Sequence, residues 1–139
     1  MKNKVFLDTS YSVALAITND ANHARSVILA NWIKTSSVAV VTTQAVMLEI
    51  GNALSKQNYR GTAIGMIDRY HSDPNTTVIS MTDELYQEGL ELFRKRSDKN
   101  WGLVDCISFI VMEESGITDA LTADGHFVQA GFRALLRGD

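Results

Sequence analysis

The sequence predicts an α/β fold in which helices cover both faces of a parallel sheet of four to five strands. Short apolar segments alternate along the chain with helical segments, which is the pattern of such folds. The short segments are also nearly continuous apolar runs, as expected for strands that are buried on both faces. At 139 residues, the chain is most simply one domain, residues 1–139, with a substantial hydrophobic core.

The first part of the chain predicts one strand followed by two helices. Residues 4–8 (KVFLD) form a short apolar run of the kind that lies buried in a sheet. Residues 10–17 follow as a helix. Over residues 19–34, apolar side chains recur at helical spacing, and Asp20 is a suitable N-cap for this second helix.

The next segments repeat the alternation of strand and helix. Residues 38–42 (VAVVT) are rich in β-branched side chains and predict the second strand. A threonine, Thr42 or Thr43, then caps a helix that extends to about Lys56. Residues 60–72 predict a further helix, which the following Asp-Pro pair closes.

A third strand and two more helices follow. Residues 76–81 (TTVISM) predict the strand. Thr82 and the two acidic residues after it begin a helix that ends in three basic residues, so its charges complement the helix dipole. Residues 103–115 predict a nearly all-apolar helix that stops at Gly116.

Two last strands, residues 118–123 and 132–137, complete the predicted sheet. In open parallel sheets, ligands bind outside the carboxyl ends of the strands. Asp8 and Asp124 both fall at that end of a predicted strand. The predicted topology therefore places these two carboxylates at the same edge of the sheet.

The composition is that of an ordinary soluble globular protein, with 45% hydrophobic and 21% charged residues. A formal net charge of −3 argues against an obviously basic nucleic-acid-binding surface. The single cysteine, Cys106, is expected to be a small buried apolar residue and excludes an internal disulfide. No signal sequence or run of membrane-spanning length is evident, so we expect a cytoplasmic protein without a membrane anchor.

Four acidic residues lie among apolar neighbours, where a carboxylate needs a compensating partner. They are Asp8, Glu49, Asp105 and Asp124. Each also has a simpler explanation. Asp8 is a suitable helix N-cap, and Asp124 is a suitable turn residue. Asp105 complements a helix dipole from the first turn, and a lone helix glutamate is usually solvated.

Glu49 fits its simpler explanation least well. At about 100° per residue, it points away from the polar side of its helix. It lines up with Ala45 and Ala53, one turn before and one turn after, whose small side chains leave space around the carboxylate. Asn52 lies close by on the same helix. The helical phase therefore favours a buried role for Glu49.

If the four carboxylates converge, they require cations or strongly raised pKa values, and a divalent metal is the simplest partner. Two unit charges about 5 Å apart repel by roughly 3 kcal/mol at an effective dielectric constant of 20. Hard oxygen ligands favour Mg²⁺ or Mn²⁺ over zinc, and the three histidines are scattered along the sequence. We expect His126 to be a surface loop side chain. Ser108, one helical turn after Asp105, is expected to hydrogen-bond the Asp105 carboxylate.

Five segments in order resemble the PIN-domain ribonucleases, including VapC-type toxins and stand-alone PIN proteins of this size. They are VFLDTS, NDANHARS, QAVMLEIGNAL, WGLVDCISF and LTADGHF, and they extend along the whole chain. The resemblance implies a PIN-like three-layer α/β/α fold. It also implies one acidic site, whose residues are Asp8, Glu49, Asp105 and Asp124.

The resemblance further implies roles within that site. Asp8 and Asp105 are the expected direct ligands of one or two Mg²⁺ or Mn²⁺ ions. Glu49 and Asp124 complete the site directly or through water. Thr9 and Ser10 match the family position that supports the site, and helical spacing adds Asn52 and Ser108 as expected supporting residues.

The function implied is a Mg²⁺-dependent endoribonuclease that hydrolyses RNA phosphodiester bonds, as the toxin of a type II toxin–antitoxin pair. Such toxins pair with a small antitoxin and often form homodimers. A stand-alone PIN ribonuclease in RNA processing and a non-catalytic RNA- or partner-binding PIN module remain alternatives. A haloacid-dehalogenase type of phosphatase is disfavoured, because it needs a second acid where this chain has Ser10.

Candidate RNA contacts are cationic and aromatic side chains outside the four acids. The cationic candidates for phosphate contacts are Lys56, Arg60, Lys95, Arg96 and Lys99. For each of these, an ordinary solvated surface charge is the simpler explanation. Tyr11 and Trp101 are candidates for stacking on bases, although packing in or beside the core is the simpler explanation for Trp101.

Overall fold

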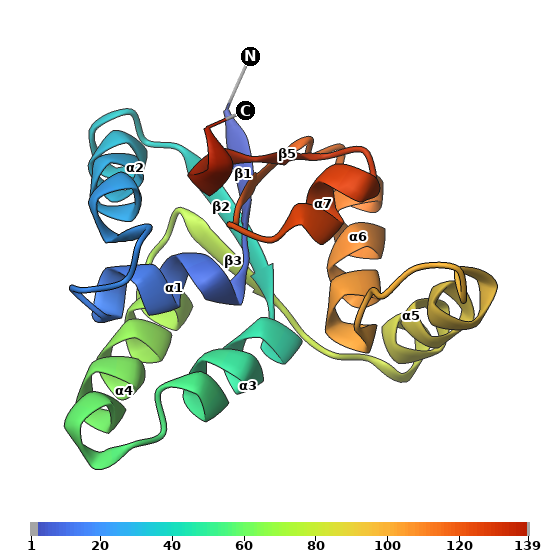
Figure 1. Ribbon diagram of the computed structural model, residues 1–139, viewed down its shortest axis with the longest axis horizontal. Helices are drawn as coiled ribbons and strands as arrows, with labels where there is room; N and C mark the ends of the chain where they lie inside the picture. The colour runs from blue at the N-terminus through green and yellow to red at the C-terminus, as the bar shows by residue number, and fades with distance from the viewer. Residues whose placement is uncertain (1–2, 139) are drawn as a thin grey trace.

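The computed structural model describes residues 3–138 and contains a five-stranded parallel sheet (Figure 1). The strands are β1 (Lys4–Leu7), β2 (Ala39–Thr43), β3 (Thr76–Ile79), β4 (Asp119–Leu121) and β5 (Arg133–Ala134). Their order in the sheet is β3-β2-β1-β4-β5, and all four pairings are parallel. The predicted fold class is confirmed.

Seven α-helices and one short 3₁₀ helix connect the strands within residues 3–138. They are α1 (Thr9–Ala16), α2 (His23–Thr35), α3 (Gln44–Ala53), α4 (Gln57–Ser72), α5 (Asp83–Lys95), α6 (Leu103–Ser115), α7 (Gly125–Gln129) and η1 (Leu135–Arg137). None of these helices is long and apolar enough to cross a lipid bilayer.

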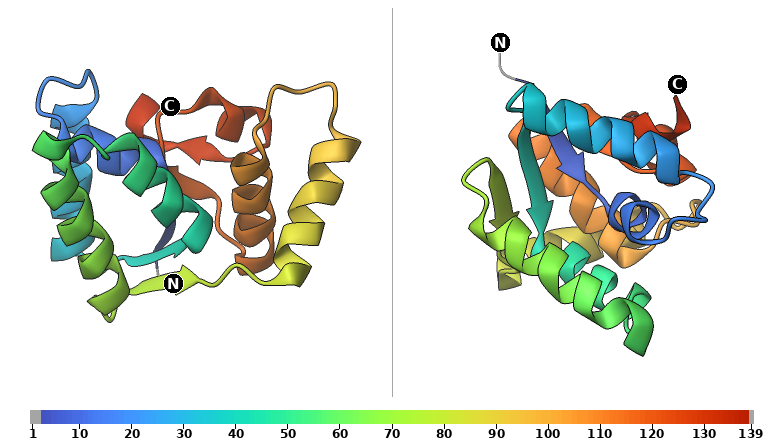
Figure 2. Two further views of the ribbon diagram at one scale, coloured as in Figure 1. Left: turned by 90° about the horizontal axis from the view of Figure 1, so that it is seen from below. Right: turned by 90° about the vertical axis from the view of Figure 1, so that its left-hand side faces the viewer.

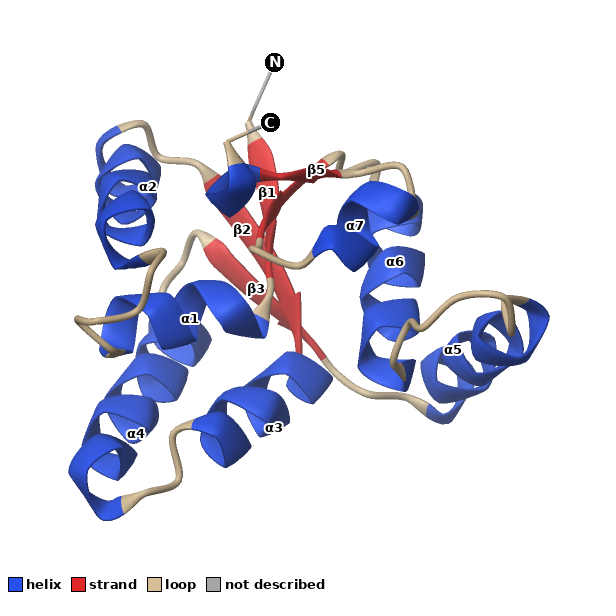
Figure 3. Ribbon diagram, viewed as in Figure 1, coloured by secondary structure: helices blue, strands red, loops and turns tan. Residues whose placement is uncertain are grey.

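The helices form two outer layers around the sheet. Helices α1 to α4 lie on one side, and α6 and α7 lie on the other, with α5 on the outer side of α6 (Figures 1 and 3). The two turned views show the same layers (Figure 2). The central strand β1 is therefore covered on both faces, and Val5, Phe6 and Leu7 are at most 2% exposed. This burial explains why the strand is an unbroken apolar run.

The strand order places a crevice beside β1. From β1 the chain continues to β2 and β3 on one side, and it later returns to place β4 and β5 on the other. The helices change face at this point, so β1 and β4 form the topological switch of the sheet, where ligands bind in open α/β folds. The backbone N–H of Asp8 donates to the carbonyl of Leu121 at 3.2 Å, which holds the two strand ends together.

Several predicted helix ends are confirmed by their caps. Thr43 caps α3, because its hydroxyl accepts a hydrogen bond from the N–H of Val46 at 3.2 Å. Thr82 caps α5 in the same way through the N–H of Leu85 at 3.0 Å. Gly116 ends α6 with a φ of 66°, in the left-handed region that glycine adopts without strain.

Other boundaries differ from the prediction. Asp20 does not cap α2, because its carboxylate accepts from the N–H of Asn22 at 2.8 Å and closes a turn just before the helix. Helix α3 ends at Ala53 rather than near Lys56, and α4 already begins at Gln57.

The last part of the chain also differs from its prediction. A turn was the simpler explanation for Asp124, but the segment after β4 forms the short helix α7 over residues 125–129. The predicted strand over residues 132–137 is a two-residue strand followed by η1. A short strand suffices there because β5 lies at the edge of the sheet and pairs only with β4.

The close approach of α5 and α6 yields a test of the fold. A Cβ atom on Gly89 would lie 2.5 Å from Cγ1 of the buried Ile107, which is too close for an ordinary contact. Gly89→Ala should therefore lower the free energy of unfolding by about 1–3 kcal/mol, even though alanine has the better helix propensity. Gly65→Ala in α4 is the matched control, because no atom lies within 4 Å of its added Cβ. Urea unfolding should show the control unchanged or slightly stabilised. Equal stability of the two variants would contradict this packing.

Candidate active site

A cavity of about 620 Å³ opens at the carboxyl-terminal edge of the sheet beside β1. All four acids singled out from the sequence line it, although they are up to 116 residues apart in the chain. No lysine or arginine is found among the described residues that line it. The lining residues are Asp8, Thr9, Ser10, Val13, Asp20, Asn22, Glu49, Asn52, Ala53, Asp105 and Asp124.

Asp8 is the most buried of the four acids, with 6% of its surface exposed. It directly precedes α1, but its side chain makes no capping hydrogen bond, so the simpler explanation as an N-cap does not hold. Burial raises the pKa of the carboxyl from 3.8 to about 6, and the negative charges of Asp105 and Glu49 act in the same direction. Hydrogen bonds from Thr122 and from the backbone N–H of Thr9 oppose this rise in pKa.

A group of hydroxyls holds Asp8 in place. The hydroxyl of the buried Thr122 donates to Asp8 Oδ2 at 2.7 Å, and the Ser10 hydroxyl lies 3.3 Å from the same oxygen. Ser10 accepts from the N–H of Ala123 at 3.0 Å, and Thr122 accepts from the N–H of Asp124 at 3.0 Å. These contacts connect the end of β1 to the segment after β4. They fix the two carboxylates relative to each other.

Glu49 reaches the cavity from α3, as its helical phase indicated. Its side chain is half-buried, and Oε1 accepts a hydrogen bond from the Thr9 hydroxyl at 2.6 Å. Asn52 and Ala53, one turn later, also line the cavity. The hydroxyl of Thr9 therefore orients Glu49, while the Asn52 side chain lies at the exposed border of the cavity.

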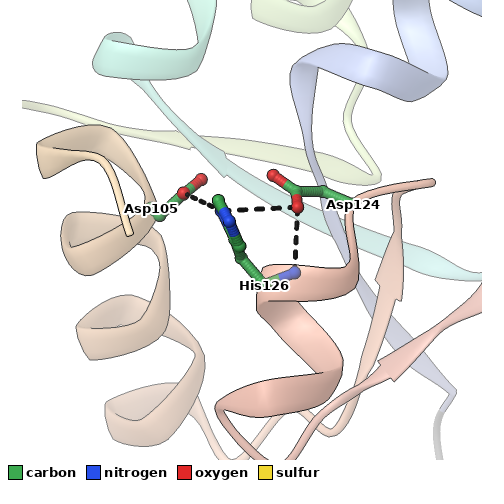
Figure 4. Close-up of side chains that lie close together, drawn as sticks. All are labelled: Asp105, Asp124 and His126. Atoms are coloured by element: carbon green, nitrogen blue, oxygen red, sulfur yellow. Dashed lines mark hydrogen bonds and ion pairs between the residues drawn. The ribbon is translucent and has the colours of Figure 1, made fainter. Parts of the chain in front are cut away.

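Asp105 and Asp124 face each other across the imidazole of His126 (Figure 4). Asp105 Oδ2 accepts from the N–H of Gly102 at 3.1 Å and lies 3.0 Å from His126 Nδ1. Asp124 Oδ1 accepts from the backbone N–H of His126 at 2.9 Å and lies 3.4 Å from the same Nδ1. One ligand atom from each of the three residues lies within 4.8 Å of the other two.

Two predictions about neighbouring side chains are wrong. His126 is not a loop residue at the surface, because it lies in the first turn of α7 and points to Asp105. Ser108 does not hydrogen-bond Asp105, and its buried hydroxyl has no partner among the described residues. The Asp105 carboxylate instead turns back to the start of α6, where it accepts from the N–H of Gly102.

Sequence reasoning missed three further residues of the site. Thr122 received no role, although a threonine two residues before a strand-end acid is a detectable signal. Asp20 and Asn22 line the cavity from the loop between α1 and α2. Both lie in the segment NDANHARS, but Asp20 was interpreted only as a helix cap.

The candidate RNA contacts lie outside the cavity. None of the five cations named above is among the described lining residues. Arg96 already has partners, since it forms two hydrogen bonds with Asp98, at 3.0 and 3.2 Å, and lies over the Trp101 ring at 5.0 Å. Trp101 is buried, as the simpler explanation of packing in or beside the core predicted. Its indole N–H donates a hydrogen bond to Gln129 Oε1 at 3.0 Å. Tyr11 is 4% exposed, so stacking on bases is wrong for this side chain.

The donor set fits a hard divalent cation. The four acids singled out from the sequence and Asp20 bring five carboxylates to one cavity without a lysine or arginine among its described lining residues, and Asp8 is almost fully buried. Burial raises the pKa of Asp8, so a cation close by would stabilise the anionic form of this carboxylate. A three-layer parallel α/β domain with clustered carboxylates at its switch point has the form of a metal-binding hydrolase site.

The chain belongs to the PIN domain family, whose family model matches residues 5–133. The chain is similar to the 23S rRNA-specific endonuclease VapC20 from two strains of Mycobacterium tuberculosis. The two sequences are 30% identical over 129 aligned residues, which cover 92% of this chain and 95% of the relative. Its fold matches the crystal structure of Mycobacterium tuberculosis VapC20, a Sarcin-Ricin loop cleaving toxin, with a TM-score of 0.79 and 26% identity. That match covers 92% of this chain and 95% of the other. The predicted resemblance to VapC-type PIN proteins is confirmed.

The raised pKa of Asp8 leads to a prediction about the free energy of unfolding of the metal-free protein. The folded protein binds the Asp8 proton more tightly than the unfolded chain does, so the contribution of Asp8 to stability is greatest below about pH 4 and is lost as the pH rises to about 6. The Asp8→Asn variant has no carboxyl at this position, so its stability does not fall in this way as the pH rises. In metal-free buffer at pH 8 it should therefore unfold with a free energy about 1–3 kcal/mol higher than the wild type.

Denaturant unfolding between pH 3.5 and pH 8 measures this difference. The gain from Asp8→Asn should vanish at the acid end of the range. Asp68→Asn, on the exposed side of α4, is the control and should stay within about 0.5 kcal/mol of the wild type at every pH. A constant gain across the range would show that repulsion and burial of the Asp8 charge are not its cause.

Proposed function

We propose that this protein is a divalent-metal-dependent endoribonuclease that hydrolyses RNA phosphodiester bonds, and that it acts as the toxin of a type II toxin–antitoxin pair. One observation carries the proposal: the four acids singled out from the sequence, joined by Asp20, line a single cavity in a PIN domain, and no described lysine or arginine lines that cavity. The similarity to an rRNA endonuclease over nearly the whole of both chains supports RNA as the substrate.

The four acids divide into two pairs in this proposal. Asp8 and Asp105 hold one or two Mg²⁺ or Mn²⁺ ions directly, and Glu49 and Asp124 complete the site directly or through water. A cation bound there would lower the pKa of a coordinated water and neutralise charge on the phosphoryl oxygens. No side chain needs to act as a covalent nucleophile.

The surrounding residues hold the acids ready for this task. Thr122 and Ser10 fix the carboxylate of Asp8, and Thr9 fixes that of Glu49. Backbone N–H groups fix Asp105 and Asp124. Because each of these carboxylates has a hydrogen-bond partner, its orientation is restricted, which is a requirement of precise metal sites.

The relative's described target suggests the kind of RNA. Its crystal structure is described as that of a Sarcin-Ricin loop cleaving toxin, so we propose a looped rRNA segment as the substrate of this chain. We further propose a cognate antitoxin that covers the acidic cavity, a homodimeric assembly and a cytoplasmic location. A short DNA-binding protein encoded by the neighbouring gene would support the toxin assignment over a stand-alone ribonuclease in RNA processing.

Cleavage of a synthetic sarcin–ricin loop RNA, alongside a mixed RNA pool, tests the activity. Asp8→Asn and Asp105→Asn should each lower the metal-dependent cleavage rate at least about 100-fold while the fold is retained, because each removes a metal ligand. Asp68→Asn, outside the cavity, should cleave like the wild type.

Circular dichroism of each variant checks that the fold is retained. Full cleavage by either site variant would refute the assignment of the acids. Binding of RNA by the wild type without cleavage at any Mg²⁺ or Mn²⁺ concentration would instead favour the non-catalytic RNA-binding module.

A further inference from the structure

The imidazole of His126 contacts two carboxylates of a site that the PIN resemblance implies to be formed by acids, although His126 is not among the described residues that line the cavity. Two features place it beside these carboxylates. His126 is in the first turn of α7, and its backbone N–H donates to the Asp124 carboxylate, which begins that helix. The ring then extends between Asp124 and Asp105 (Figure 4), and its side chain is 31% exposed.

The spacing of the three side chains suits a shared ion. His126 Nδ1 lies 3.0 Å from Asp105 Oδ2 and 3.4 Å from Asp124 Oδ1. Donor atoms about 2.1 Å from an octahedral cation lie about 3.0 Å apart when they occupy adjacent corners. The nitrogen is therefore close to the separation of adjacent ligands from each of the two oxygens, and one ligand atom from each of the three residues lies within 4.8 Å of the other two.

The kind of donor matters for the choice of ion. Mg²⁺ is bound in proteins mainly by carboxylates and water, whereas a neutral imidazole nitrogen suits first-row transition ions better. With the proton on Nε2, the lone pair of Nδ1 would be free to bind an ion that the two carboxylates also hold. A site with one nitrogen donor should therefore bind Mn²⁺ more tightly, relative to Mg²⁺, than the same site built from oxygen alone.

We propose that His126 Nδ1 joins Asp105 and Asp124 as a ligand of the divalent cation and thereby shifts the preference of the site toward Mn²⁺. This inference rests on the metal site of the proposed function, but it does not rest on cleavage of RNA. The alternative role for His126 is that of a hydrogen-bond donor that only orients Asp105. The two roles differ in whether the nitrogen contacts the ion.

Pulsed electron paramagnetic resonance of bound Mn²⁺ separates the two roles. The wild-type protein should show a ¹⁴N coupling to Mn²⁺, which ¹⁵N-histidine labelling converts to a ¹⁵N coupling. His126→Phe keeps a ring of similar size without a donor atom and should abolish the coupling. Calorimetry should show its Mn²⁺ affinity lowered about 10-fold or more, against less than about 3-fold for Mg²⁺.

His71→Phe is the matched control, because His71 is exposed at the end of α4 and does not line the cavity. It should leave the coupling and both affinities unchanged. A wild-type spectrum without nitrogen coupling, or a coupling that survives in His126→Phe, would overturn the inference. Failure of wild-type protein to bind Mn²⁺ would overturn both the inference and the metal site. A normal coupling without RNA cleavage would overturn the ribonuclease assignment alone.

Discussion

The hydrogen bond between Thr122 and Asp8 is the interaction on which the rest of the site depends. It lies where the helices change from one face of the sheet to the other, and it joins two strand ends that are far apart in sequence. A buried carboxylate in this position is costly unless it is hydrogen-bonded. The threonine offsets part of that cost, and its oxygen also receives the N–H of Asp124, so one side chain positions two acids.

Much of the fold and part of the site could be predicted because they depend on local pattern. Strands that are buried on both faces must be apolar throughout, so β1 and β2 were evident in the sequence. The position of Glu49 at the cavity could be predicted because the period of a helix is fixed. The angular position of Glu49 on its helix excluded the polar, solvent-facing side. Asp8 followed from the rule that sites form at the carboxyl ends of parallel strands.

The remaining features depend on contacts between distant segments. His126 looks like a loop residue until Asp124 begins α7 and turns the imidazole toward Asp105. Ser108 has suitable spacing from Asp105, but the nearby N–H of Gly102 takes the carboxylate instead. Asp20 has the residue type of a helix cap, and only the packed structure shows that its loop borders the acidic cavity.

The burial of Asp8 also has a consequence for how this protein changes under selection. Most substitutions that abolish an activity do so by unfolding the protein, and the cell then degrades it. Here, neutralising the most buried acid removes a source of instability. A chain inactivated by substitution of Asp8 should therefore persist as an inert protein at normal or increased abundance. Such a variant would keep the surface outside the cavity unchanged.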